Sequence, residues 1–355
     1  MNDTHSAAVL QPRPWLSHLQ PYVPGAPAAD PDGSLASNEN ALGPSPRVAA
    51  ALPGSLPGAE RYPDALSSGL VRRIAETHGI PVDTILVGNG SDELIQLLVT
   101  AYAAYGGHVV CADPPYQLHE KLPVMLGAEV TKVPLREWAH DLEAMRALAA
   151  DLAFVCNPHN PTGAILPPHE VLGFARGNRA ALTVVDEAYI EYAEAGEGAS
   201  LISSAARGEL AVLRTFSKFY GLAGMRVGFL VADPAIIRTL QAIRLPFSVN
   251  SAAQVAAEIA LADRDHGDRV RESTRENRGR LIAAFRASGY EVLESQTNFI
   301  LVFAPDEARL VGRLSEAGIQ VRPGSSLGVP GSVRISVPND AGMAMFGRLP
   351  WLQTP

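Results

Sequence analysis

The sequence predicts an α/β protein, with a large domain built on a mostly parallel β-sheet between helices and a smaller α+β domain near the C-terminus. Short apolar runs alternate with stretches of helical periodicity through most of the 355 residues. This alternation is typical of a parallel sheet with crossover helices. Nearer the C-terminus the pattern changes to short strand-like runs around a single helical stretch. The length of the chain allows two domains.

The expected strands of the large domain are six short apolar runs. They are continuously apolar instead of alternating, which favours strands that are covered by helices on both faces. Each run is followed by a polar or glycine-containing segment before the next helical pattern begins. The six runs are 84–87, 109–112, 153–156, 182–185, 211–214 and 227–231.

One long helix is expected over 251–286, where Ala, Arg and Glu recur at helical spacing and lead out of the large domain. Beyond it, 290–303 and 318–337 are expected to hold short strands, separated by a helical stretch at 306–316. The Pro-rich segment 12–57 has few periodic features, so it is expected to wrap the surface.

These patterns predict three parts of the chain. An N-terminal segment, 1–46, joins the small domain or covers the site, a large domain spans 47–255, and a small α+β domain spans 256–355. No internal repeat at a solenoid period is present.

Composition narrows the class of function. The chain is 47% apolar and 19% charged with a net charge of −8, as in an ordinary globular enzyme, and it has no excess of Lys and Arg for a nucleic-acid backbone. Cys111 and Cys156 lie in apolar runs and are expected to be buried thiols, which fits a reducing cytoplasm. Residues 1–20 lack the basic start and apolar core of a signal peptide, and no run has the length of a membrane span.

Polar residues gather directly after the expected strands. Because the carboxyl ends of parallel strands meet at one edge of a sheet, these residues are expected to form an active site there. They lie at 89–92, 113–116, 157–163, 186–189 and 215–218.

Lys218 is the strongest candidate among only three lysines. It follows the run 211–214 among hydroxyls and glycines, where an amine can lose solvent and become nucleophilic toward an aldehyde. The alternative is a solvated surface lysine, which is our interpretation of Lys121 and Lys132.

Asp186 closes the apolar run 182–185, where a carboxylate needs a cationic or donating partner. A protonated pyridine nitrogen would be such a partner, and a helix cap or a salt bridge to an arginine are the alternatives.

Asn160 lies between two prolines in 157–163, which would hold its side chain rigidly for a hydrogen bond. The alternative is that it belongs to a plain turn. The glycines of 88–93 precede an apolar helix whose N–H groups could bind a phosphate, although the same residues could simply cap that helix.

Taken together, these motifs resemble the fold type I pyridoxal-phosphate aminotransferases, and more narrowly the histidinol-phosphate aminotransferase family. The resemblance runs in order over nearly the whole chain. Ala41 and Pro338 depart from the family pattern, which usually has proline and glycine there. The motifs that carry the resemblance are 38–40, 43–46, 61–64, 90–92, 160–163, 186–189, 215–218, Arg226, 321–323 and 333–335.

The resemblance implies a seven-stranded, mostly parallel sheet in a large pyridoxal-phosphate-binding domain, and it implies roles for the residues at the strand ends. Lys218 would bind the cofactor as a Schiff base and carry the proton at the substrate carbon. Asp186 would hold the pyridinium nitrogen, Asn160 and Tyr189 would hydrogen-bond the ring hydroxyl, and Tyr116 would stack on the ring.

The cofactor phosphate would be held by residues of three segments and by a second subunit of a homodimer, which supplies Tyr62. The residues of the same subunit are Ser91, Asp92, Thr215, Ser217 and Arg226. Arg334 would take the substrate carboxylate or phosphate as a two-pronged pair, helped by Arg322 and Asn160. Tyr22 and Asn250 are further candidates for the substrate pocket. No metal is implied.

The implied activity is a ping-pong transfer of an amino group between histidinol phosphate, or a related amine, and 2-oxoglutarate. An aromatic or specialised-pathway amino acid aminotransferase is the nearest alternative, because Tyr22, Tyr116 and Asn250 do not separate an imidazole from a phenyl ring. A decarboxylase similar to the threonine-phosphate decarboxylases is a second alternative. A sensor domain of a transcription regulator is a third, which the acidic charge and the short stretch before the first motif disfavour.

Overall fold

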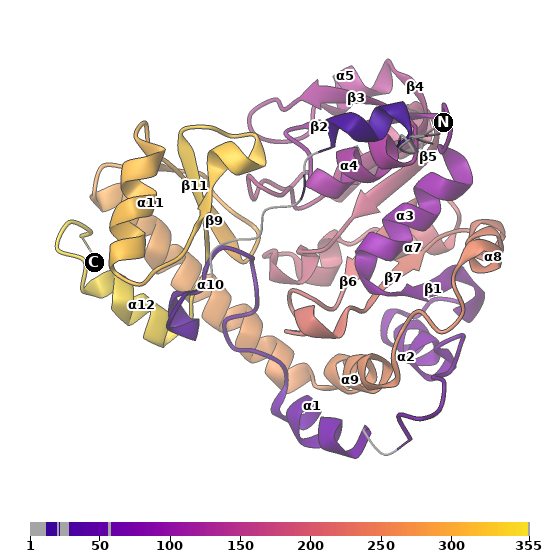
Figure 1. The fold of residues 1–355 in the computed structure, drawn as a ribbon, viewed down its shortest axis with the longest axis horizontal. Helices are drawn as coiled ribbons and strands as arrows, with labels where there is room; N and C mark the ends of the chain where they lie inside the picture. The colour runs from indigo at the N-terminus through magenta and orange to yellow at the C-terminus, as the bar shows by residue number, and fades with distance from the viewer. Residues whose placement is uncertain (1–11, 20, 22–27, 56–57, 354–355) are drawn as a thin grey trace, which may run out of the picture.

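The computed structural model describes residues 12–19, 21, 28–55 and 58–353 (Figure 1). Its strands are β1 Ile85–Gly88, β2 His108–Asp113, β3 Glu129–Pro134, β4 Ala149–Cys156, β5 Arg179–Asp186, β6 Ala211–Thr215, β7 Gly228–Val231, β8 Glu291–Val292, β9 Phe299–Phe303, β10 Arg322–Pro323 and β11 Ser332–Ser336. Its α-helices are α1 Pro46–Ala51, α2 Ser68–His78, α3 Gly90–Tyr102, α4 Gln117–Met125, α5 Leu142–Arg146, α6 Pro168–Gly177, α7 Ile202–Ala206, α8 Pro234–Ile243, α9 Ser251–Ala262, α10 Arg264–Ala287, α11 Glu307–Glu316 and α12 Asp340–Gly347. Its 3-10 helices are η1 Pro14–His18, η2 Pro31–Gly33, η3 Leu52–Ser55, η4 Val82–Thr84, η5 Ile190–Tyr192, η6 Gly196–Ala199, η7 Ala223–Met225 and η8 Gly324–Leu327.

The larger sheet has seven strands in the order β1-β7-β6-β5-β4-β2-β3. Every strand is parallel to the others except β7, which pairs antiparallel with β1 and with β6. The predicted α/β class and mostly parallel sheet are therefore confirmed. The six apolar runs correspond to β1, β2, β4, β5, β6 and β7. The seventh strand, β3, is an edge strand that mixes Glu129, Thr131 and Lys132 with apolar residues, so it carries no continuous apolar run.

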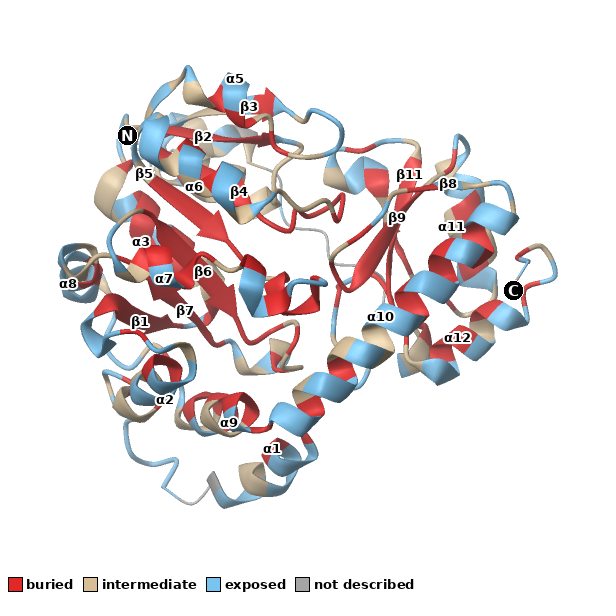
Figure 2. Cartoon of the chain, turned by 180° about the vertical axis from the view of Figure 1, so that it is seen from behind, coloured by how far each residue is buried: buried red, intermediate tan, exposed pale blue. Residues whose placement is uncertain are grey.

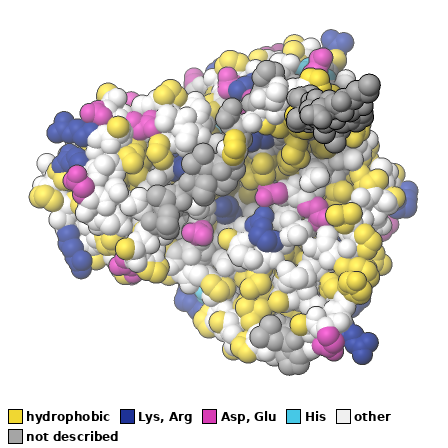
Figure 3. Space-filling view, viewed as in Figure 1, with side chains coloured by type: hydrophobic (Ala, Val, Ile, Leu, Met, Phe, Trp, Pro, Cys, Tyr) yellow, Lys and Arg dark blue, Asp and Glu magenta, His cyan; other side chains and the backbone are white. Residues whose placement is uncertain are grey.

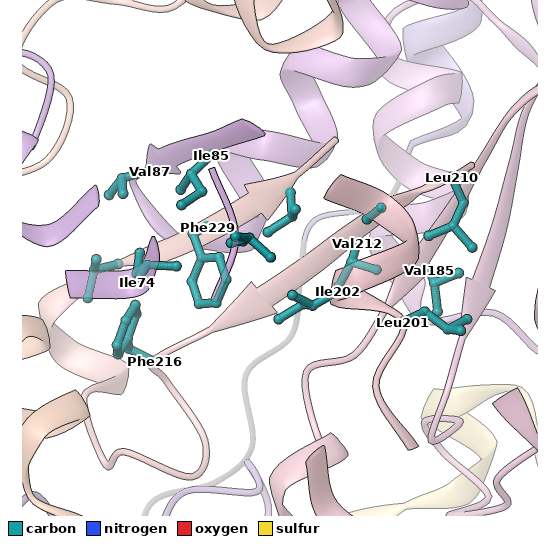
Figure 4. Close-up of a cluster of buried hydrophobic side chains, with 14 of the residues drawn as sticks. Ile74, Ile85, Val87, Val185, Leu201, Ile202, Leu210, Val212, Phe216 and Phe229 are labelled. Carbon is teal, nitrogen blue, oxygen red and sulfur yellow. The ribbon is translucent and has the colours of Figure 1, made fainter. Parts of the chain in front are cut away.

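Helices cover both faces of this sheet, as the apolar runs predict. Successive strand residues enter different cores: Val185 packs with α2, α6, α7 and α9 on one face, whereas Val184 packs with α3 and α8 on the other. Figure 2 shows the strands buried between partly exposed helices, and Figure 4 shows apolar side chains of the first core, among them Val185, Val212 and Phe229. This double cover leaves the ends of the strands as the accessible part of the sheet.

A second, four-stranded antiparallel sheet forms near the C-terminus in the order β10-β11-β9-β8. Its core combines Ile300 and Val333 with Leu281, Phe285 and Phe346 of the neighbouring helices. The predicted helical stretch at 306–316 corresponds to α11. The N-terminal segment reaches this sheet, because the N–H of Ser336 in β11 donates to the Leu35 carbonyl over 3.0 Å.

The long helix expected over 251–286 is two helices, because Asp263 interrupts it. Asp263 adopts φ −91° and ψ 74°, which is not helical, and its side chain accepts from the His266 N–H at the start of α10. Ser45 donates to the same carboxylate. Figure 1 shows α10 running from α9 toward the second sheet. The domain boundaries at 46/47 and 255/256 stay predictions, and the second of them falls within α9.

The described parts of the chain contain no helix that is long and apolar enough to cross a membrane. Within the same residues, no group of three or more His, Cys, Asp or Glu side chains could hold a metal ion.

Candidate active site

A cavity of about 580 Å³ opens where β4, β5 and β6 end, and the second sheet closes its other side. Cys156, Asp186 and Thr215, the last residues of these three strands, all line it. Arg322 and Arg334 line it from the second sheet. Figure 3 shows charged side chains in the hollowed middle of this face of the molecule. The expected clustering of strand-end residues is thus what the structure shows.

Lys218 follows β6 and lies half-buried in the cavity. Its Nζ donates to the Ser37 carbonyl over 2.9 Å. Burial, together with the charge of Arg334, lowers the pKa of Lys218 to about 8, because both disfavour the ammonium. The amine is therefore much closer to its nucleophilic form at neutral pH than an ordinary lysine is.

Asp186 is buried in the depth of the cavity at the end of β5. Its Oδ1 accepts from the Ala188 N–H over 3.1 Å, and its Oδ2 lies 3.2 Å from His119 Nε2. The His119 ring stacks on Phe154, with centroids 4.5 Å apart, and meets Tyr116 edge-on. The carboxylate is thus held in a fixed position while it faces the cavity.

No role for His119 was predicted from the sequence. The signal that could have found it is its spacing: it lies in the first turn of α4, three residues after the N-cap residue Tyr116, a separation that brings side chains together on one side of a helix.

The anion-binding end of the cavity combines a helix start with hydroxyls and an arginine. Ser91 and Asp92 lie in the first turn of α3, and Arg226 Nη2 donates to Asp92 Oδ2 over 3.1 Å. Arg226 Nη1 donates to Ser217 Oγ over 3.3 Å, and Thr215 lines the same wall. Backbone N–H groups of a helix start, hydroxyls and a guanidinium are the donors that proteins use to hold phosphate.

Two glycines keep space open at this end. A Cβ atom at Gly90, whose φ is +76°, would lie 2.6 Å from Arg226 Nη2. A Cβ atom at Gly228 would lie 2.8 Å from the Ser91 nitrogen. Side chains at either position would push apart the groups that form the cradle.

A chain of hydrogen bonds joins the second sheet to the strand ends. Arg334 Nη1 donates to Asn160 Oδ1 over 2.7 Å, and Asn160 Nδ2 donates to the Tyr189 hydroxyl over 3.3 Å. Asn38 Nδ2 donates to the same hydroxyl over 3.1 Å, and only the family motif at 38–40 pointed to this residue in the sequence. Burial raises the pKa of Tyr189, so its phenol stays protonated and can donate in turn.

Arg322 and Arg334 lie side by side on neighbouring strands of the second sheet. They are direct partners in the register of β10 and β11, and both side chains are buried. Like charges in directly opposite positions repel each other, so an anion between them would stabilise the pair. Arg334 Nη2 also donates to the Ala36 carbonyl over 2.9 Å.

The structure brings together all but three of the site residues expected from the sequence. The residues that line the cavity are Ser91, Asp92, Tyr116, Asn160, Asp186, Tyr189, Thr215, Ser217, Lys218, Arg226, Arg322 and Arg334. Tyr62 lies outside the cavity, 81% exposed and stacked on Phe247, and Tyr22 lies outside the described residues. Asn250 does not line the cavity either, because it caps α9 through the Ala253 N–H. Lys121, interpreted as a surface lysine, does line the cavity.

The residues present fit the pyridoxal phosphate that the resemblance implies. A phosphate requires the donor set around Ser91 and Arg226, kept open by Gly90 and Gly228. A pyridinium nitrogen requires a buried carboxylate such as Asp186. The aldehyde requires an amine with a lowered pKa, which Lys218 provides.

Comparison with known proteins decides the family. The family model described as aminotransferase class I and II matches residues 33–346. The chain belongs to this aminotransferase family.

Individual aminotransferases are similar to this one over nearly their whole length. A histidinol-phosphate aminotransferase of Moorella thermoacetica is 38% identical over 346 residues, which cover 93% of this chain and 90% of that protein. An aromatic amino acid aminotransferase of Thermobifida fusca is also 38% identical, covering 93% and 94%. The crystal structure of a histidinol-phosphate aminotransferase from Sinorhizobium meliloti, in complex with pyridoxal-5'-phosphate, superposes with a TM-score of 0.88 at 29% identity, covering 97% of this chain and 98% of that one.

Proposed function

We propose that this aminotransferase moves an amino group between histidinol phosphate and 2-oxoglutarate, in a ping-pong cycle that interconverts the latter with glutamate. The observation that carries the proposal is that Lys218, the buried Asp186, an anion cradle and two arginines of the second sheet all line one shared cavity. The similarity to proteins named histidinol-phosphate aminotransferase supports the choice of amino donor.

Pyridoxal phosphate is the cofactor of this aminotransferase. When bound, it accepts the electron pair that the substrate carbon beside the amine gives up. Asp186 would hold the proton on the ring nitrogen, and His119 keeps that carboxylate in place. Asn160 and Tyr189 would bind the ring hydroxyl, and Tyr116 would cover the ring face.

The remaining groups would bind anions and move the proton. Ser91, Asp92, Thr215, Ser217 and Arg226 would hold the cofactor phosphate. Lys218 Nζ would hold the cofactor between turnovers and then carry the proton to and from the reacting carbon. Arg334, helped by Arg322 and by Tyr22, would take the anionic group of the substrate: the carboxylate of glutamate or the phosphate of histidinol phosphate.

The proposal includes a homodimer in which Tyr62 reaches the cofactor phosphate of the other subunit. Tyr62 lies with Phe247 on a surface that also exposes Leu66 and Leu245. Exposed apolar side chains gathered in this way are typical of a protein interface. We also propose that the enzyme works in the cytoplasm without nucleic acid or membrane partners, in line with its buried free thiols Cys111 and Cys156.

The absorption spectrum of the purified protein with pyridoxal phosphate tests the proposal. We expect the band of the enzyme-bound cofactor to give way to that of pyridoxamine phosphate far faster with histidinol phosphate than with phenylalanine. Faster conversion by phenylalanine would favour the aromatic aminotransferase instead. Release of carbon dioxide from a phosphorylated amino acid would favour the decarboxylase, and no cofactor band at all would contradict the enzyme class.

A further inference from the structure

Lys121 is the one lysine besides Lys218 that lines the active-site cavity of the described chain. It lies half-buried on α4. Among the residues that the structure describes, its ammonium makes no hydrogen bond or ion pair. The neighbouring carboxylate of Glu120 is instead 3.2 Å from Lys132 Nζ, and Asp113 also pairs with Lys132. Lys121 therefore carries a positive charge beside the cavity that no described carboxylate neutralises.

The surroundings of Lys121 place it on a different wall from the reacting groups. Gln117, one helical turn earlier on the same face of α4, donates its Nε2 to the Ser326 carbonyl of η8 over 2.8 Å. Gln117, Leu118 and Leu327 line the cavity beside Lys121. This wall is thus formed by α4 and η8.

Arg334, in contrast, belongs to the wall that carries Lys218. Arg334 donates to the Ala36 carbonyl, and Lys218 donates to the carbonyl of the next residue, Ser37. Arg334 also bonds Asn160, which bonds Tyr189. An anion bound by Arg334 therefore lies next to the reacting amine.

The charges that line the cavity favour a substrate with acidic groups at both ends. The described lining contains five cationic side chains, Lys121, Lys218, Arg226, Arg322 and Arg334, against three acidic ones, Glu39, Asp92 and Asp186. Arg226 is paired with Asp92, and Asp186 is in contact with His119. Lys121 and Arg334 thus present positive charge on two different walls of the cavity, and the attraction of a second anion is strongest inside a cavity from which water is displaced.

We propose that Lys121 is a specificity-determining residue that binds the acidic group at the end of the substrate remote from the group held by Arg334. This group is a carboxylate, as in glutamate and 2-oxoglutarate, or a phosphate. The inference rests on the proposed aminotransfer and deepens it for the half-reaction of glutamate and 2-oxoglutarate, which are anionic at both ends. Histidinol phosphate has one acidic group, which Arg334 would hold, so it would not need Lys121.

The test compares three acids that bind the holoenzyme without reacting. Glutarate has two carboxylates, pentanoate has a methyl group in place of the second, and 4-phosphonobutyrate has a phosphonate there. Dissociation constants are measured by calorimetry on the wild type and on Lys121→Met. We expect the wild type to bind at least one of the two diacids more tightly than pentanoate, and Lys121→Met to lose about tenfold of that preference, the value of one charged hydrogen bond. If Lys121→Met loses the preference over pentanoate for only one of the two diacids, that diacid carries the kind of anion that Lys121 binds.

Two matched variants complete the experiment. Lys121→Arg keeps the charge and should keep the preference, and Lys132→Met removes a lysine that is paired outside the cavity lining and should leave it unchanged. No preference in the wild type, an unchanged preference in Lys121→Met, or an equal weakening of all three acids would overturn the proposal. Failure of the proposed function is distinguishable, because it would appear as absence of conversion by histidinol phosphate in the wild type, whatever the acids do.

Discussion

At the scale of single residues, the active site depends on a lysine whose charge is suppressed by its surroundings. Lys218 has a pKa of about 8 because of burial and of the nearby Arg334. Its amine is charged below that pH and neutral above it, and only the neutral form attacks an aldehyde. We therefore expect the rate at which the cofactor-free protein takes up pyridoxal phosphate to rise with pH and to be half-maximal near pH 8, measured by stopped-flow absorbance.

Replacement of Arg334 tests how much of the lowering of the Lys218 pKa comes from the charge of Arg334 and how much from burial. Arg334→Met removes a positive charge that disfavours the ammonium, so the midpoint of the uptake profile should move to higher pH. Arg348→Met, at an exposed position directly after α12, should leave it unchanged. A midpoint that stays in place in Arg334→Met would show that Arg334 does not control the charge of Lys218.

The sequence predicted the residues that follow strands better than those that enter the site from elsewhere. Lys218, Asp186 and Asn160 were found because a polar residue after an apolar run marks a strand end. His119 and Lys121 lie on α4, which carries no recognised motif. The chain has nine histidines, and Lys121 does not follow an apolar run, so neither residue was assigned to the site. Their position follows only from how α4 packs beside the sheet.

At the scale of secondary-structure elements, one buried arginine ties together the ends of two strands. Arg214 of β6 is 1% exposed and donates to Glu187, Glu191 and Glu197 over 3.0, 2.7 and 2.7 Å. Glu187 is next to Asp186 in the sequence, and Arg214 is next to Thr215. The ion pairs thus fix the strand ends that carry the candidate cofactor contacts.

Arg214→Met should destabilise the protein strongly, because it leaves buried carboxylates without their cation. Breaking a buried ion pair in this way costs about 3–5 kcal/mol, measurable as the free energy of unfolding in urea with the cofactor bound. Arg275→Met, which removes an exposed pair with Glu272 on α10, is the matched control and should change little. Equal effects of both substitutions would contradict a special role for the buried cluster.

For two elements, the spacing of apolar residues in the sequence did not predict the structure. The edge strand β3 was not among the apolar runs, because only Val133 of its six residues is buried. The helix expected over 251–286 is divided at Asp263, whose carboxylate both caps α10 and accepts from Ser45, a residue far away in the sequence. A helix break that depends on a distant partner cannot be predicted from the spacing of neighbouring residues.

At the scale of the whole molecule, the proposed dimer can be tested on its surface. Leu245 is 73% exposed and lies two residues before Phe247, which stacks on Tyr62. A charge there should not be tolerated in an apolar interface. We expect Leu245→Asp to shift sedimentation from dimer toward monomer. Tyr105→Asp, at an exposed tyrosine that follows α3, should leave the dimer intact, and a wild-type monomer would contradict the proposal.

The strand order also has a consequence for how the chain folds. Arg226 and Asp92 are 134 residues apart in the sequence, and they meet because β7 inserts between β1 and β6. Such a pairing closes a long loop, whose entropy must be overcome before the contacts form, so it is expected to come late. The phosphate cradle is complete only when this last pairing is made, and uptake of cofactor by a refolding chain would therefore mark the end of folding instead of guiding its early steps.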